Sequence, residues 1–65
     1  MQTTYYEDDD ILVLKLSDKP IVRETSQDWN INVSYDAEGG IVEVVVLEAK
    51  ATGLYPIRVD HPKAA

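Results

Sequence analysis

Apolar and polar residues alternate along most of this chain, and the alternation predicts β-strands. Apolar positions recur at every second residue, and β-branched residues dominate these stretches, as is typical of strands. In the clearest stretch, 29–35, the apolar residues share one face and the polar residues share the other, which indicates an antiparallel strand that is buried on one side. The pattern predicts strands over residues 3–6, 11–16, 21–25, 29–35 and 41–47.

Turn-forming residues separate these stretches. Residues 7–10 are four consecutive carboxylates, which would repel one another inside a paired ladder and are therefore expected to form a turn. Residues 17–20 combine Ser and Asp, which bond to their own backbone, with Pro, which fixes φ. Residues 36–40 end in two glycines, which favour a tight hairpin loop. The more polar stretch 21–25 carries neighbouring charges and is expected at an edge of the sheet.

The C-terminal quarter of the chain shows weaker signals. Residues 48–52 favour helix individually, but the segment is too short for a stable helix. Residues 54–59 are expected to be extended, because Pro56 disfavours a helical conformation in the residue before it. The tail from Asp60 is expected to be loose.

Two of the predicted strands, 11–16 and 41–47, are apolar on both faces. A sheet with one face in water would alternate throughout, so both faces of these strands need cover. One cover could be the C-terminal segment 54–57, and the other could be the same face of a second copy, as in a sheet-on-sheet homodimer. The residues expected on the core or dimer face are Leu12, Leu14, Leu16, Trp29, Ile31, Val33, Tyr35, Val42, Val44 and Val46.

The size of the chain supports the same interpretation. With 65 residues it is long enough for one domain, and domains of this size usually need disulfides, a metal or a partner subunit. The chain has no cysteine and one histidine, which leaves oligomerisation as the remaining source of buried surface. The predicted fold is therefore a mainly β, antiparallel β-meander of four to five strands, which forms one domain over residues 1–65 and packs sheet-on-sheet in a homodimer.

The charge limits the partners that the chain could bind. Its formal net charge is −6, from 12 acidic and 6 basic side chains. This balance argues against nucleic acid, which needs a basic surface, and against an anionic membrane surface. It leaves open a basic protein partner, although acidity can also serve solubility alone. The first residues do not resemble a signal peptide, no apolar run is long enough to span a membrane, and the absence of cysteine fits a cytoplasmic location.

Candidate chemistry is sparse, and neither a catalytic residue nor a cofactor is predicted. Acid–base catalysis needs two positioned groups in a water-poor pocket, for which a sheet this small has little room. The candidate carboxylates are Asp10, Asp28, Asp36 and Glu43. Capping of turns by Asp28 and Asp36, and a cross-strand pair of Glu43 with Lys15 or Arg23, are the simpler interpretations. His61 lies in the tail, where it is not expected to serve a serine nucleophile.

Two groups of polar residues could bind a ligand. The acidic run 7–10 could hold a hard cation, but it lacks the spacing and the central glycine of a calcium loop, so a solvated turn is the simpler interpretation and no metal site is predicted. The polar stripe on stretch 29–35 could bond to a partner or a small ligand, or it could be the solvent face. Trp29 and Tyr35 are expected in the core or a dimer interface rather than in a ligand platform.

Several motifs in a fixed order resemble the bacterial family called domain of unknown function 2283. The motifs are Tyr5…Asp9-Asp10-Ile11-Leu12-Val13-Leu14-Lys15-Leu16, Pro20-Ile21-Val22, Ile31-x-Val33-x-Tyr35-Asp36-x-x-Gly39-x-Ile41-Val42 and Glu43-x-Val45-x-Leu47-Glu48-Ala49. The resemblance covers a core of about 5–49, and residues 50–65 are a C-terminal extension. Two positions depart from the pattern: Val13 stands where an aromatic residue is usual, and Glu43 where glycine is usual.

The resemblance implies a compact β-meander and a family without an established biochemical function. Some of its members lie beside small toxin-like proteins and are suspected of being antitoxins. The function predicted for this chain is a non-enzymatic protein-interaction module, in its sharper form an antitoxin-like partner of a basic protein. The alternatives are a small-ligand or ion-binding module and a purely structural accessory subunit.

Overall fold

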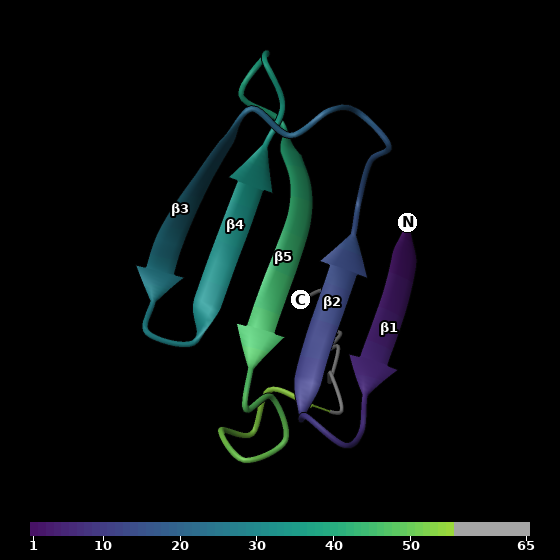
Figure 1. Cartoon of the computed structure of the whole chain (residues 1–65), viewed down its shortest axis with the longest axis vertical. Coiled ribbons are helices and arrows are strands. Elements are labelled where there is room, and N and C mark those ends of the chain that lie inside the picture. The colour runs from purple at the N-terminus through teal and green to yellow at the C-terminus, as the bar shows by residue number, and fades with distance from the viewer. Residues whose placement is uncertain (56–65) are drawn as a thin grey trace, which may run out of the picture.

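The computed structural model describes residues 1–55, in which five antiparallel strands form one sheet (Figure 1). This confirms the mainly β, antiparallel fold that the alternation predicts. Residues 41–47 match the predicted strand at both ends, because a stretch rich in β-branched residues follows the glycines of the preceding loop. The strands are β1 (Gln2–Tyr6), β2 (Ile11–Lys15), β3 (Arg23–Asp28), β4 (Ile31–Tyr35) and β5 (Ile41–Leu47).

The strand order is β1-β2-β5-β4-β3, which is meander-like except at one connection. Hairpins join β1 to β2 and run from β3 through β4 to β5, whereas residues 16–22 cross the end of the sheet from β2 to its far edge (Figure 1). The crossing places β5 beside β2, so the two strands that are apolar on both faces form the centre of the sheet. The prediction that the third strand lies at an edge is confirmed.

The cross-strand register places most of the predicted core residues on one side of the sheet, here called the covered face. Leu12 is 1% exposed and Val46 is 5% exposed, and they are direct neighbours across the β2–β5 pair. Leu16 lies just after β2 and is exposed. The rows of neighbours on this face are Tyr5–Leu12–Val46–Ile31 and Thr3–Leu14–Val44–Val33–Thr25.

Trp29 does not belong to this face, and the prediction that a strand begins there is wrong. Trp29 lies with Asn30 in the two-residue turn between β3 and β4, and it is 65% exposed. The carboxylate of Asp28 accepts the backbone N–H of Trp29 at 2.8 Å and fixes this turn. The turn contains neither glycine nor proline, and the alternation of apolar and polar residues continues through it. The alternation therefore does not show where β4 begins.

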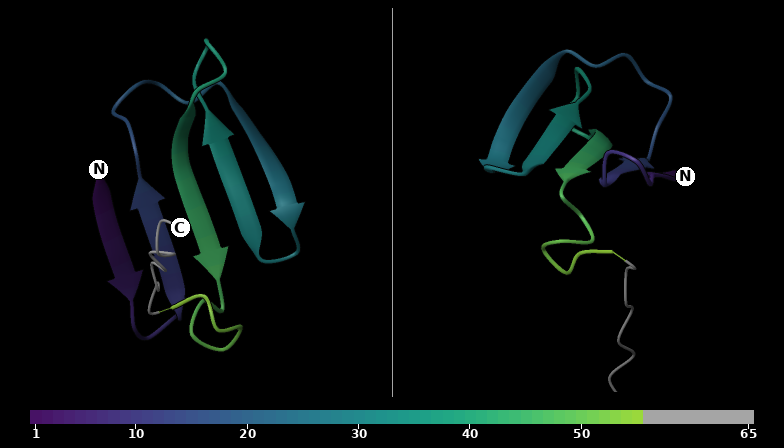
Figure 2. Two further views of the ribbon diagram at one scale, coloured as in Figure 1. Left: turned by 180° about the vertical axis from the view of Figure 1, so that it is seen from behind. Right: turned by 60° about the horizontal axis from the view of Figure 1, so that its bottom comes forward.

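Residues 48–55, here called the closing loop, fold against the covered face (Figure 2). Ala49 is completely buried in a cluster with Leu12 and Val46. Tyr55 stacks on Tyr5, with 4.0 Å between ring centroids and 9° between ring planes. The closing loop therefore supplies part of the cover that was expected from residues 54–57.

The remaining predictions for the C-terminal quarter lie outside the described residues. These predictions concern Pro56 and Ile57 as part of the cover, the extended segment up to Val59, the loose tail from Asp60, and His61. Residues 48–52 form turns, as expected for a segment too short to be a helix.

Candidate functional site

The opposite side of the sheet, here called the open face, carries an apolar patch on three of the five strands, β1, β2 and β5. The closing loop lies on the other side of the sheet and does not cover this patch (Figure 2). Tyr6 is 52% exposed and Leu47 is 40% exposed, and the other members are half-buried by their neighbours. The patch consists of Tyr6, Ile11, Val13, Val45 and Leu47.

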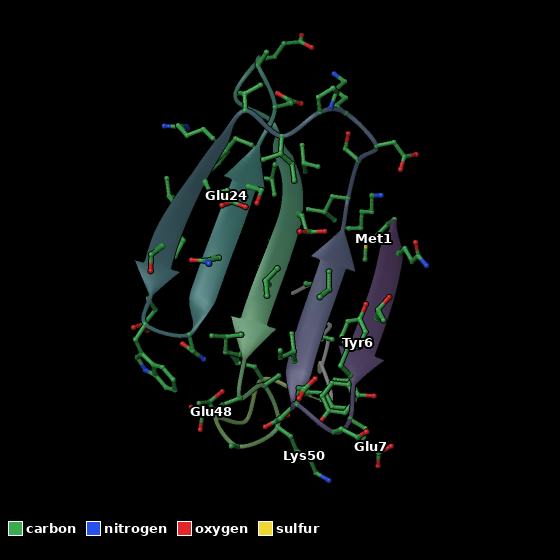
Figure 3. The ribbon with its side chains drawn as sticks, viewed as in Figure 1. Met1, Tyr6, Glu7, Glu24, Glu48 and Lys50 are labelled. Carbon is green, nitrogen blue, oxygen red and sulfur yellow. The ribbon has the colours of Figure 1, made fainter. Side chains whose placement is uncertain are left out.

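Carboxylates border the patch at the end of the sheet where β1 and β5 finish. Glu7 directly follows Tyr6, and Glu48 directly follows Leu47. Figure 3 shows Glu7, Glu48 and Lys50 along this end of the molecule. The exposed carboxylates here, named the acidic rim, are Glu7, Asp8, Asp9 and Glu48.

Lysines balance the carboxylates at the other end of the sheet. Lys19 lies 3.0 Å from a carboxylate oxygen of Glu38 and 3.9 Å from one of Asp36. Lys15 lies 3.5 Å from a carboxylate oxygen of Asp18. Within residues 1–55, none of the ion pairs involves the acidic rim. The acidic rim beside the apolar patch therefore has no ion pair among the described residues.

Asp10 differs from the other three carboxylates of its run, because it binds the closing loop. Its Oδ1 accepts the hydroxyl of Tyr5 at 2.7 Å and the backbone N–H of Lys50 at 2.8 Å, and its Oδ2 accepts the N–H of Ala51 at 3.1 Å. Its backbone carbonyl accepts the N–H of Ala49 at 3.0 Å. The turn predicted at 7–10 is present, but the interpretation of the whole run as solvated is wrong at Asp10.

These contacts change the acidity of both side chains. The N–H of Lys50, followed by the hydroxyl of Tyr5, lowers the pKa of Asp10, because both groups stabilise the carboxylate form. The hydrogen bond to Asp10, together with desolvation, raises the pKa of Tyr5 to about 12. Asp10 also has a φ of 54°, in the left-handed region that Asp and Asn tolerate better than most residues.

The other carboxylates considered for catalysis lie apart. Asp28 fixes the β3–β4 turn, and Asp36 accepts the N–H groups of Glu38 and Gly40 at 2.9 and 2.8 Å in the β4–β5 loop. These hydrogen bonds, that of Gly40 first, lower the pKa of Asp36. Glu43 is the direct neighbour of Lys15 across β2 and β5. The sheet therefore does not bring these groups to one place.

The polar stripe predicted on stretch 29–35 is divided between different environments. Asn30 is buried in the turn, where its side-chain N–H donates to the carbonyl of Leu47 at 3.2 Å. Ser34 is also buried, and its hydroxyl donates to Glu24 at 3.3 Å. Only Asn32 is exposed. Interpretation of the stripe as a solvent face is therefore wrong for Asn30 and Ser34, because each is used in an internal hydrogen bond.

Tyr35 belongs to a small cluster on the outer part of the covered face. The guanidinium carbon of Arg23 lies 4.5 Å from its ring centroid, a distance at which cation–π attraction operates. Its hydroxyl lies 3.4 Å from donors on Thr25 and Gln27. These contacts fasten the edge strand β3 to β4.

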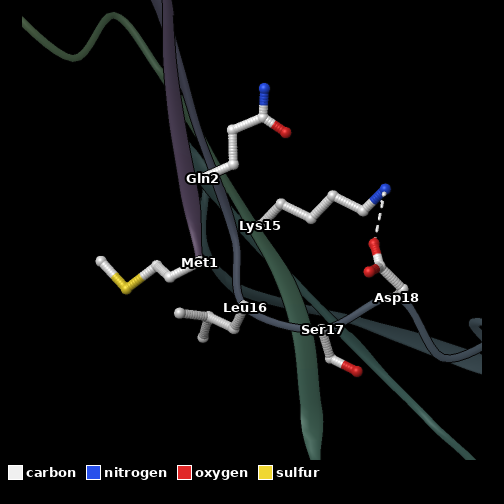
Figure 4. Close-up of a pocket in the computed structure, with 6 residues that line it drawn as sticks. All are labelled: Met1, Gln2, Lys15, Leu16, Ser17 and Asp18. Carbon is white, nitrogen blue, oxygen red and sulfur yellow. Dashed lines mark ion pairs between the residues drawn. The ribbon is translucent and has the colours of Figure 1, made fainter.

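A shallow depression of about 280 Å³ lies where β1 begins and β2 ends (Figure 4). It is lined by Met1, Gln2, Lys15, Leu16, Ser17 and Asp18. In Figure 4 the Lys15–Asp18 ion pair lies on one side and the apolar ends of Met1 and Leu16 lie on the other. The polar groups that line the depression do not converge on a common point.

The described residues contain neither a cluster of metal-binding side chains nor a membrane-spanning helix. No three His, Cys, Asp or Glu side chains among them are grouped so that they could hold a metal ion. The part of the chain that the structure describes also has no helix long and apolar enough to cross a membrane.

Comparison with known proteins identifies the family. The model of the family described as "Protein of unknown function (DUF2283)" matches residues 2–50. The match covers most of the chain, and the chain therefore belongs to this family. Searches of curated proteins and of solved structures gave no significant match. The matched range ends in the closing loop, one residue after Ala49, and it includes both the apolar patch and the acidic rim.

Proposed function

We propose that this chain is a non-enzymatic protein-interaction module and that the apolar patch and the acidic rim together form its contact surface. The observation that carries the proposal is their continuity: Tyr6 leads directly into Glu7, and Leu47 leads directly into Glu48. Protein interfaces commonly have an apolar centre and a polar border. The partner that fits this surface has an apolar contact surface beside Lys or Arg side chains.

The two parts of the surface have different roles in binding. Burial of the apolar patch supplies affinity, because removing apolar area from water is favourable. The acidic rim attracts a basic partner over a distance and suppresses acidic competitors. Ion pairs at the other end of the sheet neutralise much of the charge there, so the field guides a basic partner towards the patch.

Charge also favours a basic protein over a second copy docked face to face on this patch. A two-fold axis parallel to the strands would place the two acidic rims side by side. An axis across the strands would place each patch on the polar row of the other copy. That row consists of Gln2, Lys15, Glu43, Ser34 and Glu24.

The sharper form of the proposal is an antitoxin-like role, in which the partner is a basic toxin and the setting is the cytoplasm. Support for this form comes from the family resemblance and the net charge of −6. A chain that neutralises a toxin needs a surface for protein binding and no catalytic centre of its own.

The test is capture of partners by the tagged protein from its own cells, with matched variants. Wild type should capture a basic protein, and raised salt should weaken the capture. Leu47→Ser should reduce the capture at least tenfold, as should the triple variant Glu7→Gln, Asp8→Asn and Asp9→Asn. Asp18→Asn, at the other end of the sheet, should capture as wild type does. All four proteins should first be shown to melt cooperatively.

Two results would contradict the proposal. One is recovery of no protein except the chain itself, which would favour a structural accessory subunit. The other is equal capture of the same protein by wild type, Leu47→Ser and the triple variant, which would place the contact elsewhere.

A further inference from the structure

The two edge strands of the sheet differ in how well they are protected against pairing with another strand. β3 carries three charged residues, Arg23, Glu24 and Asp28, and its register with β4 is interrupted between Ser26 and Asp28. Charges and bulges of this kind prevent edge-to-edge association. β1 has the sequence Gln-Thr-Thr-Tyr-Tyr, without charge, proline or glycine, and its register with β2 is continuous.

We propose that β1 pairs antiparallel with β1 of a second copy, so that two five-stranded sheets join into one. Each edge strand has a row of N–H and C=O groups that its single neighbour leaves unpaired. Antiparallel pairing would satisfy that row on both copies through a closed two-fold interface. This arrangement is edge to edge, unlike the sheet-on-sheet dimer expected from the sequence, and it does not depend on the proposed function.

Charge complementarity argues for a second copy as the occupant, despite the net charge of −6. The acidic rim begins where β1 ends, so antiparallel pairing places the two rims at opposite ends of the joint. Five residues at about 3.3 Å each separate them by about 17 Å, which exceeds the screening length of about 8 Å at physiological salt. Parallel pairing would place the rims together.

In this pairing a basic residue, Lys15, lies near the acidic rim of the second copy. In a register centred on Thr4, Gln2 lies opposite Tyr6 of the second copy. Lys15 is the direct neighbour of Gln2 within its own sheet. Only Gln2 therefore separates Lys15 from Tyr6 of the second copy, and Lys15 lies close to Glu7 of that copy. Lys15 is held only by an ion pair with the almost fully exposed Asp18, and pairs of this kind contribute little. It is therefore available to the rim of the second copy.

The pairing also joins the open faces. The two-fold axis of antiparallel strands runs perpendicular to the sheet, so the open faces of both copies lie on the same side. Thr4 shares a row with Val13 and Val45 on this side, and the Thr4 residues of the two copies would lie directly opposite each other. Threonine pairs opposite each other on antiparallel strands are favourable.

The first test uses mass and cross-linking. Light scattering at about 100 μM should give twice the monomer mass of 7.3 kDa. Because the chain has no cysteine, Thr4→Cys should form a disulfide-linked dimer under mild oxidation, since cysteines opposite each other on paired strands meet the distance that a disulfide requires. Ser26→Cys on β3 is the matched control and should remain uncross-linked. A monomeric wild type, or equal cross-linking of both variants, would overturn the proposal.

The second test uses charge at the centre of the joint. Thr4→Lys alone and Thr4→Glu alone should each be monomeric at this concentration and should still melt cooperatively. An equimolar mixture of the two should recover the dimer mass. Dimers that persist in both single variants would overturn the edge-to-edge pairing, and loss of the dimer in Leu47→Ser instead would indicate sheet-on-sheet packing.

Discussion

Neighbouring residues of β5 lie in opposite environments although their side chains are chemically alike. Val46 is 5% exposed on the covered face, whereas Leu47 is 40% exposed on the open face. The central strands are apolar on both faces, so hydrophobicity alone does not decide which face is buried. The buried face is the one that the closing loop covers, and Asp10, in the turn between β1 and β2, binds the backbone of the closing loop there. The comparison shows that the position of the closing loop, which Asp10, Ala49 and Tyr55 hold in place, distinguishes the covered face from the open face.

Introduction of a charge at adjacent positions of β5 should have the largest and most unequal effect. Val46→Asp places a carboxylate in the covered cluster without a partner, at a cost of several kcal/mol. That cost is comparable with a total stability of about 5 kcal/mol for a small domain, so the variant should be unfolded by circular dichroism. Val45→Asp, on the open face, should remain folded and melt cooperatively. Equal damage from both substitutions would show that the open face is also buried.

Loss of the anchor should have the next largest effect. Asp10→Asn keeps a residue that tolerates positive φ but removes the negative charge that three donors share. We expect thermal unfolding to occur at a melting temperature lower by roughly 5 °C or more, because hydrogen bonds to charged groups are stronger than neutral ones. Asp9→Asn, the exposed neighbour, is the control and should melt within about 1 °C of wild type. A melting temperature of Asp10→Asn equal to that of Asp9→Asn would mean that the anchor contributes nothing.

Lowering the pH should remove the stability that the ionised carboxylate of Asp10 contributes in wild type. The pKa of Asp10 and that of Asp36 are lowered in the folded state by the N–H groups that they accept. A lowered folded-state pKa adds stability above the ordinary value of 3.8, and that stability is lost as the pH falls below 3.8 and through the lowered value. Urea unfolding between pH 7 and pH 2 should therefore show the difference between wild type and Asp10→Asn shrinking below about pH 4. A constant difference across this range would contradict the linkage.

The smallest effect on stability should come from ionisation of the Tyr5 hydroxyl at alkaline pH. The pKa of Tyr5 is raised from 10.0 to about 12 by the hydrogen bond to Asp10, so the contribution of the neutral phenol is complete below pH 10 and is lost as the pH rises through 12. Wild type should be more stable than Tyr5→Phe at neutral pH, and the difference should disappear above pH 12. Tyr6→Phe, on the open face, is the control. A difference that does not change with pH would show that the hydroxyl of Tyr5 does not act through Asp10.

The sequence predicts much of this fold because its strands have strong local signals. Alternation and β-branching locate β5 at both ends, and the charges of residues 23–24 mark an edge. The same pattern fails at Trp29, where alternation continues into a turn without glycine or proline. Residues 11–16 and 41–47 are apolar on both faces, which indicates that both faces of the sheet need cover. The closing loop covers one face, and the other is the open face.

Long-range contacts explain what sequence patterns do not show. Asp10 is one of four consecutive carboxylates, and its partner Lys50 lies 40 residues further along the chain. No local signal distinguishes Asp10 from Asp9, so only the fold reveals which of them is an anchor and which belongs to the acidic rim. The position of β5 beside β2 likewise depends on the crossing of residues 16–22 and not on any local pattern.

Alkylation of single cysteines tests most directly whether the chain seals one face of its sheet and leaves the other bare. The chain has no cysteine of its own, so Val46→Cys and Leu47→Cys each provide one reporter on adjacent residues. In the folded protein, Leu47→Cys should react nearly as fast as in denaturant, and Val46→Cys should react roughly a hundredfold more slowly, because it must wait for local or global opening. Equal rates for the two cysteines would contradict the distinction between a covered and an open face.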